Sequence, residues 1–326
     1  MAPWRPPASI SSNPGTFVIC RNGYFGIRLG NIAQRCGAIV HEVDSPWGQP
    51  VDPQALSDEL AKHSRVKAVG VVHAETSTGV LTPMPEIIDV IHRHGAISIV
   101  DAVTSLGGHD MQVDEWGIDV CYSGTQKCLG APPGLAPITL SESAMQVVKA
   151  RETPVQSFYF NLQDLESYWG QSRSYHHTAP ISMTYALREA LRMMMEEGIE
   201  KRIDRHARVA AALRAGLEAL GLDLLANPEH RLNPLTTVGI PEGIDDSQVR
   251  STLLNEYGIE IGGGLGEFRG KAWRIGLMGD SARDRNVLAL LSALEQILNA
   301  NGYEVAYGSS LAAAQKALAA ASPASG

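Results

Sequence analysis

Two segments of the sequence carry residues that could perform covalent chemistry on a carbonyl group. Asp101 ends the apolar run at residues 98–101, and open α/β sheets bind ligands at the carboxyl ends of such strands. Lys127 follows a second apolar run, at residues 120–122, in a turn of small residues. A lysine amine is a nucleophile only when deprotonated, and partial burial near other cations lowers its pKa enough for imine formation. The pair therefore predicts an amine and a carboxylate at one site.

Pyridoxal phosphate (PLP) chemistry requires such a pair. A lysine holds the cofactor aldehyde as an imine, and a carboxylate keeps the pyridine nitrogen protonated so that the ring withdraws electrons. For an isolated pair the simpler interpretation is structural, with Asp101 capping a turn and Lys127 extending its ammonium group into solvent. The two residue types alone favour this structural interpretation, so the assignment depends on further motifs.

Six motifs resemble those of class V aminotransferases, specifically the alanine–glyoxylate / serine–pyruvate (serine–glyoxylate) branch. They lie at residues 22–26, 73–79, 100–108, 122–127, 175–178 and 273–277. The resemblance extends over nearly the whole chain, and the motifs occur in the family's order. It implies a PLP-dependent aminotransferase that transfers the amino group of alanine or serine to glyoxylate or pyruvate.

The resemblance also implies a role for each matching position. Lys127 forms the imine with the cofactor and moves the proton during the reaction, and Asp101 pairs with the pyridine nitrogen. The other cofactor contacts that the resemblance implies are Val103 beneath the ring, Gln126 at the phosphate, Thr76 at the ring edge and Phe25 on the ring face. Taken without the resemblance, Thr76 belongs to a polar turn, and Phe25 is an ordinary packing residue.

The same resemblance implies a substrate contact and a partner subunit. Arg274 matches the arginine that binds the substrate α-carboxylate, because a planar guanidinium donates two parallel hydrogen bonds to a carboxylate. Its alternative is a solvent-facing position on a strand. Tyr175 and Thr178 match residues that reach the phosphate of the partner's cofactor across a homodimer. We therefore expect a homodimer that binds small amino acids and 2-oxo acids.

Other chemistries are disfavoured by the residues. His176 and His177 are adjacent, so their side chains do not point the same way on a helix or strand, and no metal ligands are predicted. The glycines at residues 262–266 lack the spacing of a dinucleotide-binding loop. Cysteine desulfuration, a reaction of related enzymes, is also disfavoured because Gln126 replaces their usual histidine and Cys128 lies in a constrained turn.

The N-terminal residues depart from the family pattern. Members seat the cofactor phosphate on a helix N-terminus after a small-residue loop, typically Ser-Gly-His. The first fifteen or so residues contain Pro3, Pro6, Pro7 and Pro14 and no such loop, and these prolines argue against a helix. We expect an N-terminally truncated chain whose residues 1 to about 13 are an out-of-frame translation. The alternative function is that of a truncated, cofactor-deficient and inactive homologue.

The elements that must position these residues follow from apolar spacing. Buried strands are predicted at residues 17–20, 68–72, 96–100, 120–122 and 135–140, and helices at 27–36, 53–62 and 85–94. This alternation predicts a parallel sheet. A connecting helix within the helical region 181–220 is predicted to lead to strands at 222–225, 236–240 and 273–277. A final helix is predicted to start at Ser281 with a capping box formed with Asp284.

The expected fold is therefore α/β, and by resemblance it is PLP-dependent transferase fold type I, with a mostly parallel large domain and a smaller C-terminal α+β domain. We predict an atypical N-terminus at 1–15, the PLP-binding large domain at 16–197, the small domain at 198–308 and an Ala-rich tail at 309–326.

Composition excludes several classes of protein. The chain has 326 residues, is 44% hydrophobic and carries a formal net charge of -8, so no electrostatic footprint for nucleic acid or an anionic membrane is expected. No apolar stretch has the length of a membrane span or the pattern of a signal peptide. The four cysteines are scattered, which is typical of reduced thiols in a cytoplasmic protein.

Overall fold

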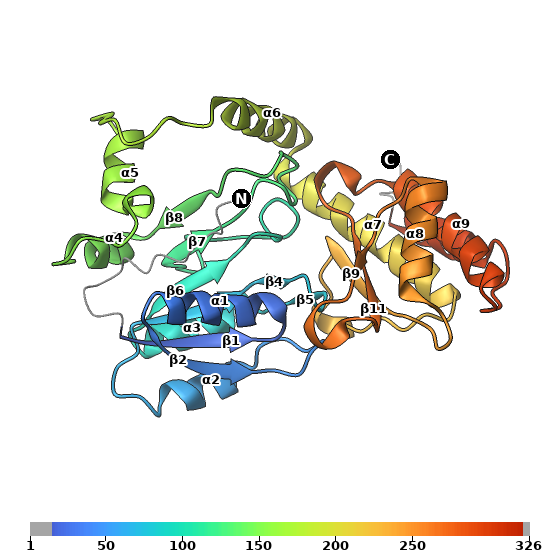
Figure 1. Cartoon of the computed structure of the whole chain (residues 1–326), viewed down its shortest axis with the longest axis horizontal. Helices are drawn as coiled ribbons and strands as arrows, with labels where there is room; N and C mark the ends of the chain where they lie inside the picture. The colour runs from blue at the N-terminus through green and yellow to red at the C-terminus, as the bar shows by residue number, and fades with distance from the viewer. Residues whose placement is uncertain (1–14, 322–326) are drawn as a thin grey trace.

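The computed structural model describes residues 15–321 and confirms the predicted α/β architecture with a mostly parallel sheet (Figure 1). The expectation about residues 1 to about 13 lies outside the described residues. The strands of the main sheet, in spatial order, are β2 (Ile39–Asp44), β1 (Thr16–Arg21), β3 (Ala68–Val72), β6 (Ile97–Asp101), β7 (Val120–Tyr122) and β8 (Ile138–Leu140). Neighbouring strands are parallel except β7 and β8, which are antiparallel.

The sheet forms where the chain has short apolar runs. All five residues of β3 are buried, as are the central four of β1, which is the pattern of strands covered on both faces. The register aligns Asp101 with Val72 of β3 and with Tyr122 of β7. The carboxyl ends of the central strands therefore meet at one edge, and Asp101 lies there.

Helices α1 (Tyr24–Arg35), α2 (Pro53–Leu60) and α3 (Met84–Arg93) lie along this sheet (Figure 1). Helix α1 buries Gly26, Leu29, Gly30 and Ala33, a spacing that places one stripe of the helix against the strands. A Cβ at Gly26 would lie 2.8 Å from the Cys20 carbonyl oxygen. Because Gly26 has no side chain, the first turn of α1 can approach β1 closely.

The long helical region is two helices, which corrects the prediction of one connecting helix. Helix α6 (Ile181–Glu197) ends and α7 (Ile199–Ala219) begins at Gly198, whose φ of 84° favours glycine. Upstream lie α4 (Glu142–Lys149) and α5 (Leu162–Trp169), which the apolar pattern did not predict.

The C-terminal part contains a small antiparallel sheet covered by helices. Its elements are β9 (Leu235–Gly239), β10 (Gly262–Gly263), β11 (Ala272–Gly276), α8 (Asp246–Tyr257), α9 (Asp284–Ala300) and α10 (Ser309–Ala320). The strand predicted at 222–225 is wrong, because that segment makes only an isolated bridge between Leu224 and Val238. The predicted capping box is also wrong. The Ser281 hydroxyl accepts a hydrogen bond from the Met278 N–H in the preceding turn, and no side chain caps α9.

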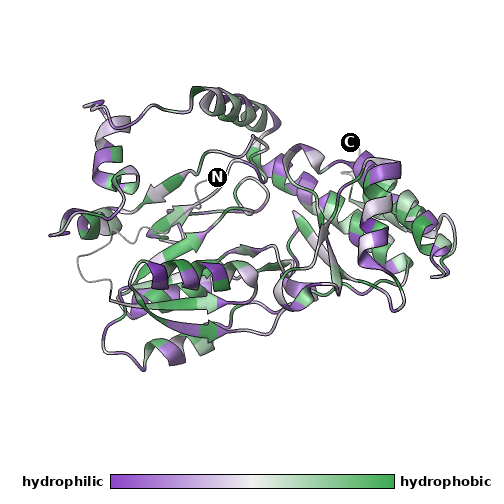
Figure 2. Cartoon of the chain, in the orientation of Figure 1, coloured by the Kyte–Doolittle hydropathy of each residue, from purple (hydrophilic) through white to green (hydrophobic). Residues whose placement is uncertain are grey.

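Apolar side chains form three main cores. Two lie against the main sheet, one with α2 and α3 and the other with α1. The third packs α7 and α9 against β9 and β11. Figure 2 shows the apolar colouring on the strands of the main sheet. Ala74, Leu232 and Leu235 form a small cluster that joins residues from both parts. None of the helices between residues 15 and 321 is long and apolar enough to cross a bilayer.

Two histidines join distant segments as hydrogen-bond acceptors. Fully buried His206 donates from Nδ1 to the Arg202 carbonyl over 2.7 Å and accepts at Nε2 from the Gly279 N–H over 3.0 Å. His109 accepts at Nε2 from the Asn233 N–H over 3.2 Å. Because a backbone N–H can only donate, both accepting nitrogens must be unprotonated. Burial lowers the pKa of each histidine from 6.5 to about 4.

These lowered pKa values predict that acid destabilises the fold. Above about pH 6.5 the folded and unfolded states are both neutral at these histidines. As the pH falls toward 4, only the unfolded chain takes up the protons, so stability falls by up to about 1.4 kcal/mol per pH unit for each histidine. His206→Gln, which retains an acceptor but cannot titrate, should have a shallower dependence. Urea unfolding over about pH 4.5–7.5 measures the slope, and equal slopes for both proteins would contradict this explanation.

Candidate active site

Asp101 lies at the carboxyl end of β6, where its carboxylate is held by two hydrogen bonds. Oδ1 accepts from the Val103 N–H over 2.9 Å, and Oδ2 accepts from the Tyr122 hydroxyl over 2.7 Å. Burial raises the pKa of Asp101, although these two bonds and the positive charges of Arg28 and Lys127 oppose that shift. The carboxylate is thus fixed in orientation and located where a cationic partner would stabilise its charged form.

Lys127 lies in the turn after β7 and is half-buried. Burial lowers its pKa, the nearby charge of Arg274 adds to this effect, and the charge of Asp101 opposes it. Hydrogen bonds close the turn on both sides of the lysine, from the Gly130 N–H to the Lys127 carbonyl and from the Ala131 N–H to the Thr125 carbonyl. The turn thus fixes the backbone of Lys127, and the lowered pKa lets its amine deprotonate more readily than that of a surface lysine, as a nucleophile requires.

A buried turn at residues 75–79 holds the first turn of α1. Glu75 is fully buried. Its Oε2 accepts from the N–H groups of Phe25 at 3.0 Å and Gly26 at 3.1 Å, while Oε1 accepts from the Ser77 N–H at 3.0 Å and the Ser77 hydroxyl at 2.6 Å. Burial raises the pKa of Glu75 and these bonds lower it. A carboxylate at a helix N-terminus satisfies otherwise unpaired N–H groups and complements the helix dipole.

Arg274 reaches this turn from β11. Its Nε donates to the Gly263 carbonyl over 2.8 Å, and NH1 donates to the Thr76 carbonyl over 3.3 Å. Among residues 15–321 it makes no salt bridge with a carboxylate, although the charge of Glu75 counteracts the burial that lowers its pKa. A half-buried guanidinium held by carbonyls can donate hydrogen bonds to a carboxylate ligand. This position differs from the solvent-facing strand position that was the alternative.

The structure gathers most of the predicted cofactor contacts around these groups. Thr76 is buried within the 75–79 turn, and Val103, two residues after Asp101, donates its N–H to the Asp101 carboxylate. Phe25 is half-buried in the first turn of α1, where its ring packs edge-on against Tyr24 at 5.7 Å. Gln126 is exposed beside Lys127. The residues come from four separate segments of the chain and remain predictions as cofactor contacts.

Tyr175 and Thr178 are placed differently. They lie in the connection between α5 and α6, and their hydroxyl groups contact each other at 3.3 Å. The Tyr175 side chain is 79% exposed. Within the part of the chain that the structure describes, no hydrogen bond joins either residue to the Lys127 turn.

Two residues of the site had no assigned role in the sequence analysis. Glu75 and Tyr122 were noticed only as members of motifs, yet Glu75 holds α1 and Tyr122 orients Asp101. In the sequence, Glu75 could be recognised only as an acidic residue shortly after a buried strand. Its partners lie about fifty positions earlier, so local patterns could not reveal them.

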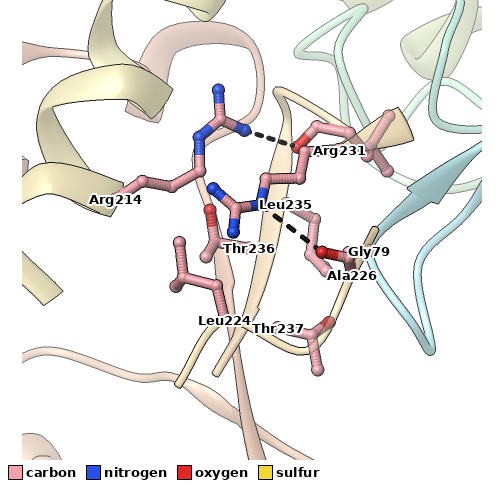
Figure 3. Close-up of a pocket in the computed structure, with 9 residues that line it drawn as sticks. Gly79, Arg214, Leu224, Ala226, Arg231, Leu235, Thr236 and Thr237 are labelled. Carbon is pink, nitrogen blue, oxygen red and sulfur yellow. Dashed lines mark hydrogen bonds between the residues drawn. The ribbon is translucent and has the colours of Figure 1, made fainter. Parts of the chain in front are cut away.

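A small pocket of about 10 Å³ lies behind the 75–79 turn and does not include the proposed reacting groups. It is lined by Gly79, Arg214, Leu224, Ala226, Arg231, Leu232, Leu235, Thr236 and Thr237. Figure 3 shows the two guanidinium groups on one side and the threonines below. A pocket of this size holds about one water molecule, so it is no substrate site.

Comparisons with known proteins agree on one family. A family model described as aminotransferase class-V matches residues 14–267. The (S)-ureidoglycine–glyoxylate transaminase of Bacillus subtilis is 42% identical over 310 residues, which cover 90% of this chain and 74% of that protein. The alanine–glyoxylate aminotransferase of Callithrix jacchus is 40% identical over 290 residues, covering 87% of this chain and 70% of that protein. The crystal structure of ureidoglycine–glyoxylate aminotransferase from Bacillus subtilis has a TM-score of 0.92 at 43% identity, covering 95% of this chain and 80% of that one.

The role of Glu75 can be tested by Glu75→Gln. The amide supplies one acceptor where the carboxylate supplied two, so we expect a loss of about 1.5–3 kcal/mol of stability. Hydrogen exchange should quicken first at the Phe25 and Gly26 amides. Glu86→Gln, in the exposed first turn of α3, is the matched control and should leave both quantities unchanged. Retained protection at the α1 amides of the Glu75 variant would contradict the assignment.

Proposed function

The chain belongs to the class V aminotransferase family, and on that premise we propose that it transfers the amino group of a small amino acid to glyoxylate or pyruvate with PLP as cofactor. One observation carries the proposal: the Lys127 amine lies in a half-buried turn within electrostatic reach of both Asp101 and Arg274. An amine, a carboxylate and a guanidinium at one site are the groups that this reaction needs.

The residues present are compatible with PLP. Its aldehyde requires an amine of lowered pKa, and burial lowers the pKa of Lys127. Its pyridine nitrogen requires a fixed carboxylate, and Asp101 is held by Val103 and Tyr122. Because burial raises the pKa of Asp101, a cationic ring nitrogen would compensate the cost of the buried negative charge. The Asp101 carboxylate therefore suits a protonated ring.

Bound PLP supplies an aldehyde that condenses with amines and a ring that withdraws electrons from the substrate α-carbon. In our proposal the Lys127 amine would take up the proton of the substrate α-carbon as a general base and would release it again as a general acid. Asp101 keeps the ring nitrogen protonated throughout. Val103 and Phe25 enclose the ring faces, Thr76 contacts the ring edge, and Gln126 contacts the phosphate.

Arg274 sets the class of substrate in this proposal. A guanidinium binds a carboxylate with two parallel hydrogen bonds, and every amino acid or 2-oxo acid substrate carries such a group. Relatives are named for glyoxylate as acceptor, with ureidoglycine or alanine as donor. We propose alanine or serine as donor here, and ureidoglycine is the donor to compare with them.

We also propose that the functional unit is a homodimer. No residue of α6 is buried, and the segment from Phe158 to Met195 exposes large apolar side chains. The exposed fractions are 68% for Phe158, 63% for Trp169, 79% for Tyr175, 68% for Tyr185 and 74% for Met195. Apolar surface of this extent is typical of an interface. A second copy that covers this surface would bring Tyr175 and Thr178 to the partner's site. In our proposal these two residues do not serve the site of their own chain.

The assignment of Lys127 is tested with Lys127→Ala and, as control, Lys149→Ala, an exposed lysine of α4. Both proteins are purified with added PLP. The wild type and the control should show the visible absorption of bound cofactor and transfer an amino group from alanine or serine to glyoxylate. Lys127→Ala should lose that absorption and most of the activity, because the covalent tether and the base are removed. Identical spectra in all three proteins would refute the proposed site.

The shared site is tested by co-expressing two inactive chains. One carries Lys127→Ala, and the other carries Tyr175→Ala with Thr178→Ala. If Tyr175 and Thr178 serve the partner, each mixed dimer contains one intact site, and activity returns. If they serve their own chain, both sites of the mixed dimer are defective. Activity no higher than that of the separate variants would therefore contradict the proposed arrangement.

A further inference from the structure

We propose that His41, Glu59 and His63 form a binding site for one divalent transition-metal ion, with Zn²⁺ as the best match. The site is on the opposite flank of the main sheet from the Lys127 turn, because β2 is an edge strand and β7 lies beyond β1, β3 and β6. Nothing in the proposed transamination uses it. It would be a second, separate site of this protein.

Strand β2, helix α2 and the turn that follows α2 bring the residues together. His41 lies in the middle of β2, paired in register with Val18 of β1. Glu59 lies in the last turn of α2, and His63 lies just beyond the end of that helix, where its Nε2 contacts the Glu59 carboxylate. Leu56 and Leu60 are buried in the core that also contains Val43 of β2. This packing holds the end of α2 against the edge strand.

The three side chains lie close enough together to bind one ion. One ligand atom from each residue lies within 4.8 Å of the other two. The Nε2 of His63 is 3.0 Å from Oε1 of Glu59, and the His41 and His63 ring centroids are 3.9 Å apart at an interplanar angle of 39°. Neighbouring ligand atoms of tetrahedral Zn²⁺, with bonds near 2.0–2.2 Å, lie about 3.3 Å apart. Binding of an ion would therefore require the three ligand atoms, which lie within 4.8 Å of one another without it, to adopt that spacing at three corners of a tetrahedron.

The ligand chemistry selects the kind of ion. Two imidazoles and one carboxylate suit zinc, cobalt and nickel, whereas magnesium and calcium prefer all-oxygen sites. All three residues are partly exposed, so an ion can enter, and water can take the fourth position. Lys62 contacts the other Glu59 oxygen, Oε2, at 2.7 Å, which leaves Oε1 for the metal.

The competing interpretation is a surface ion-pair cluster of Glu59 with Lys62 and His63. That cluster explains Glu59 and His63 without a metal. It does not explain His41, whose ring lies against His63 and has no hydrogen-bond partner among residues 15–321. An ion bound by both imidazole rings would give a ring nitrogen of His41 a partner and would connect the edge strand β2 to α2.

The test uses the full-length protein with its PLP, freed of any affinity tag and of metal by chelator treatment. Calorimetric titration with Zn²⁺ should reveal one saturable site per chain, and the thermal unfolding midpoint should rise with Zn²⁺ concentration, because the ion binds only the folded state. Mg²⁺ should do neither. His41→Gln and His63→Gln should each weaken Zn²⁺ binding at least about tenfold. His94→Gln, an exposed histidine elsewhere, should bind as the wild type does.

The outcomes separate the two interpretations. Loss of the single site in both His41→Gln and His63→Gln, with the unliganded unfolding midpoint unchanged, supports the metal site. Absence of saturable Zn²⁺ binding would overturn the proposal. It would also be overturned by Zn²⁺ binding that all the variants retain, which would indicate adventitious sites such as the half-buried Cys36 or the pair His176 and His177.

Discussion

A buried carboxylate must find hydrogen-bond donors, and in this protein Glu75 finds them in a helix that lies far from it in sequence. Each of its oxygens accepts two hydrogen bonds, one pair from Ser77 and the other from Phe25 and Gly26. An uncompensated buried charge costs several kcal/mol. The first turn of α1 and the 75–79 turn therefore adopt their positions together, and Phe25 is placed with them.

The same turn connects the two halves of the molecule. The carbonyl of Thr76, next to Glu75, accepts a hydrogen bond from Arg274 on β11. The carbonyl of Gly79 accepts one over 2.8 Å from the N–H of Leu232, which belongs to the small apolar cluster that joins the two parts. Arg274 is thereby held near Lys127, and its charge helps to lower the pKa of the lysine. A substrate carboxylate bound to Arg274 would weaken that effect. Substrate binding and the basicity of Lys127 are thus electrostatically coupled.

The segment between α4 and α7 contrasts with this tightly bonded centre. It contains few buried residues, and its aromatic side chains cluster with one another, as in the stack of Phe158 on His176 at 4.6 Å. A helix such as α6, which buries no residue within its own chain, gains little from tertiary packing there. Its stability and the function of Tyr175 therefore both depend on the second copy that we propose to cover it.

The sequence by itself determined the central strands, the sheet edge at which Asp101 lies and the turn that carries Lys127, because runs of buried residues and small-residue turns are local patterns. It did not determine β2, whose mixed residues reflect a half-exposed edge strand, or the break at Gly198. Only the tertiary structure decided the partners of Glu75, the surroundings of Arg274 and the meeting of His41 with Glu59 and His63. These depend on burial, charge and contacts between segments distant in sequence, and no local pattern encodes them.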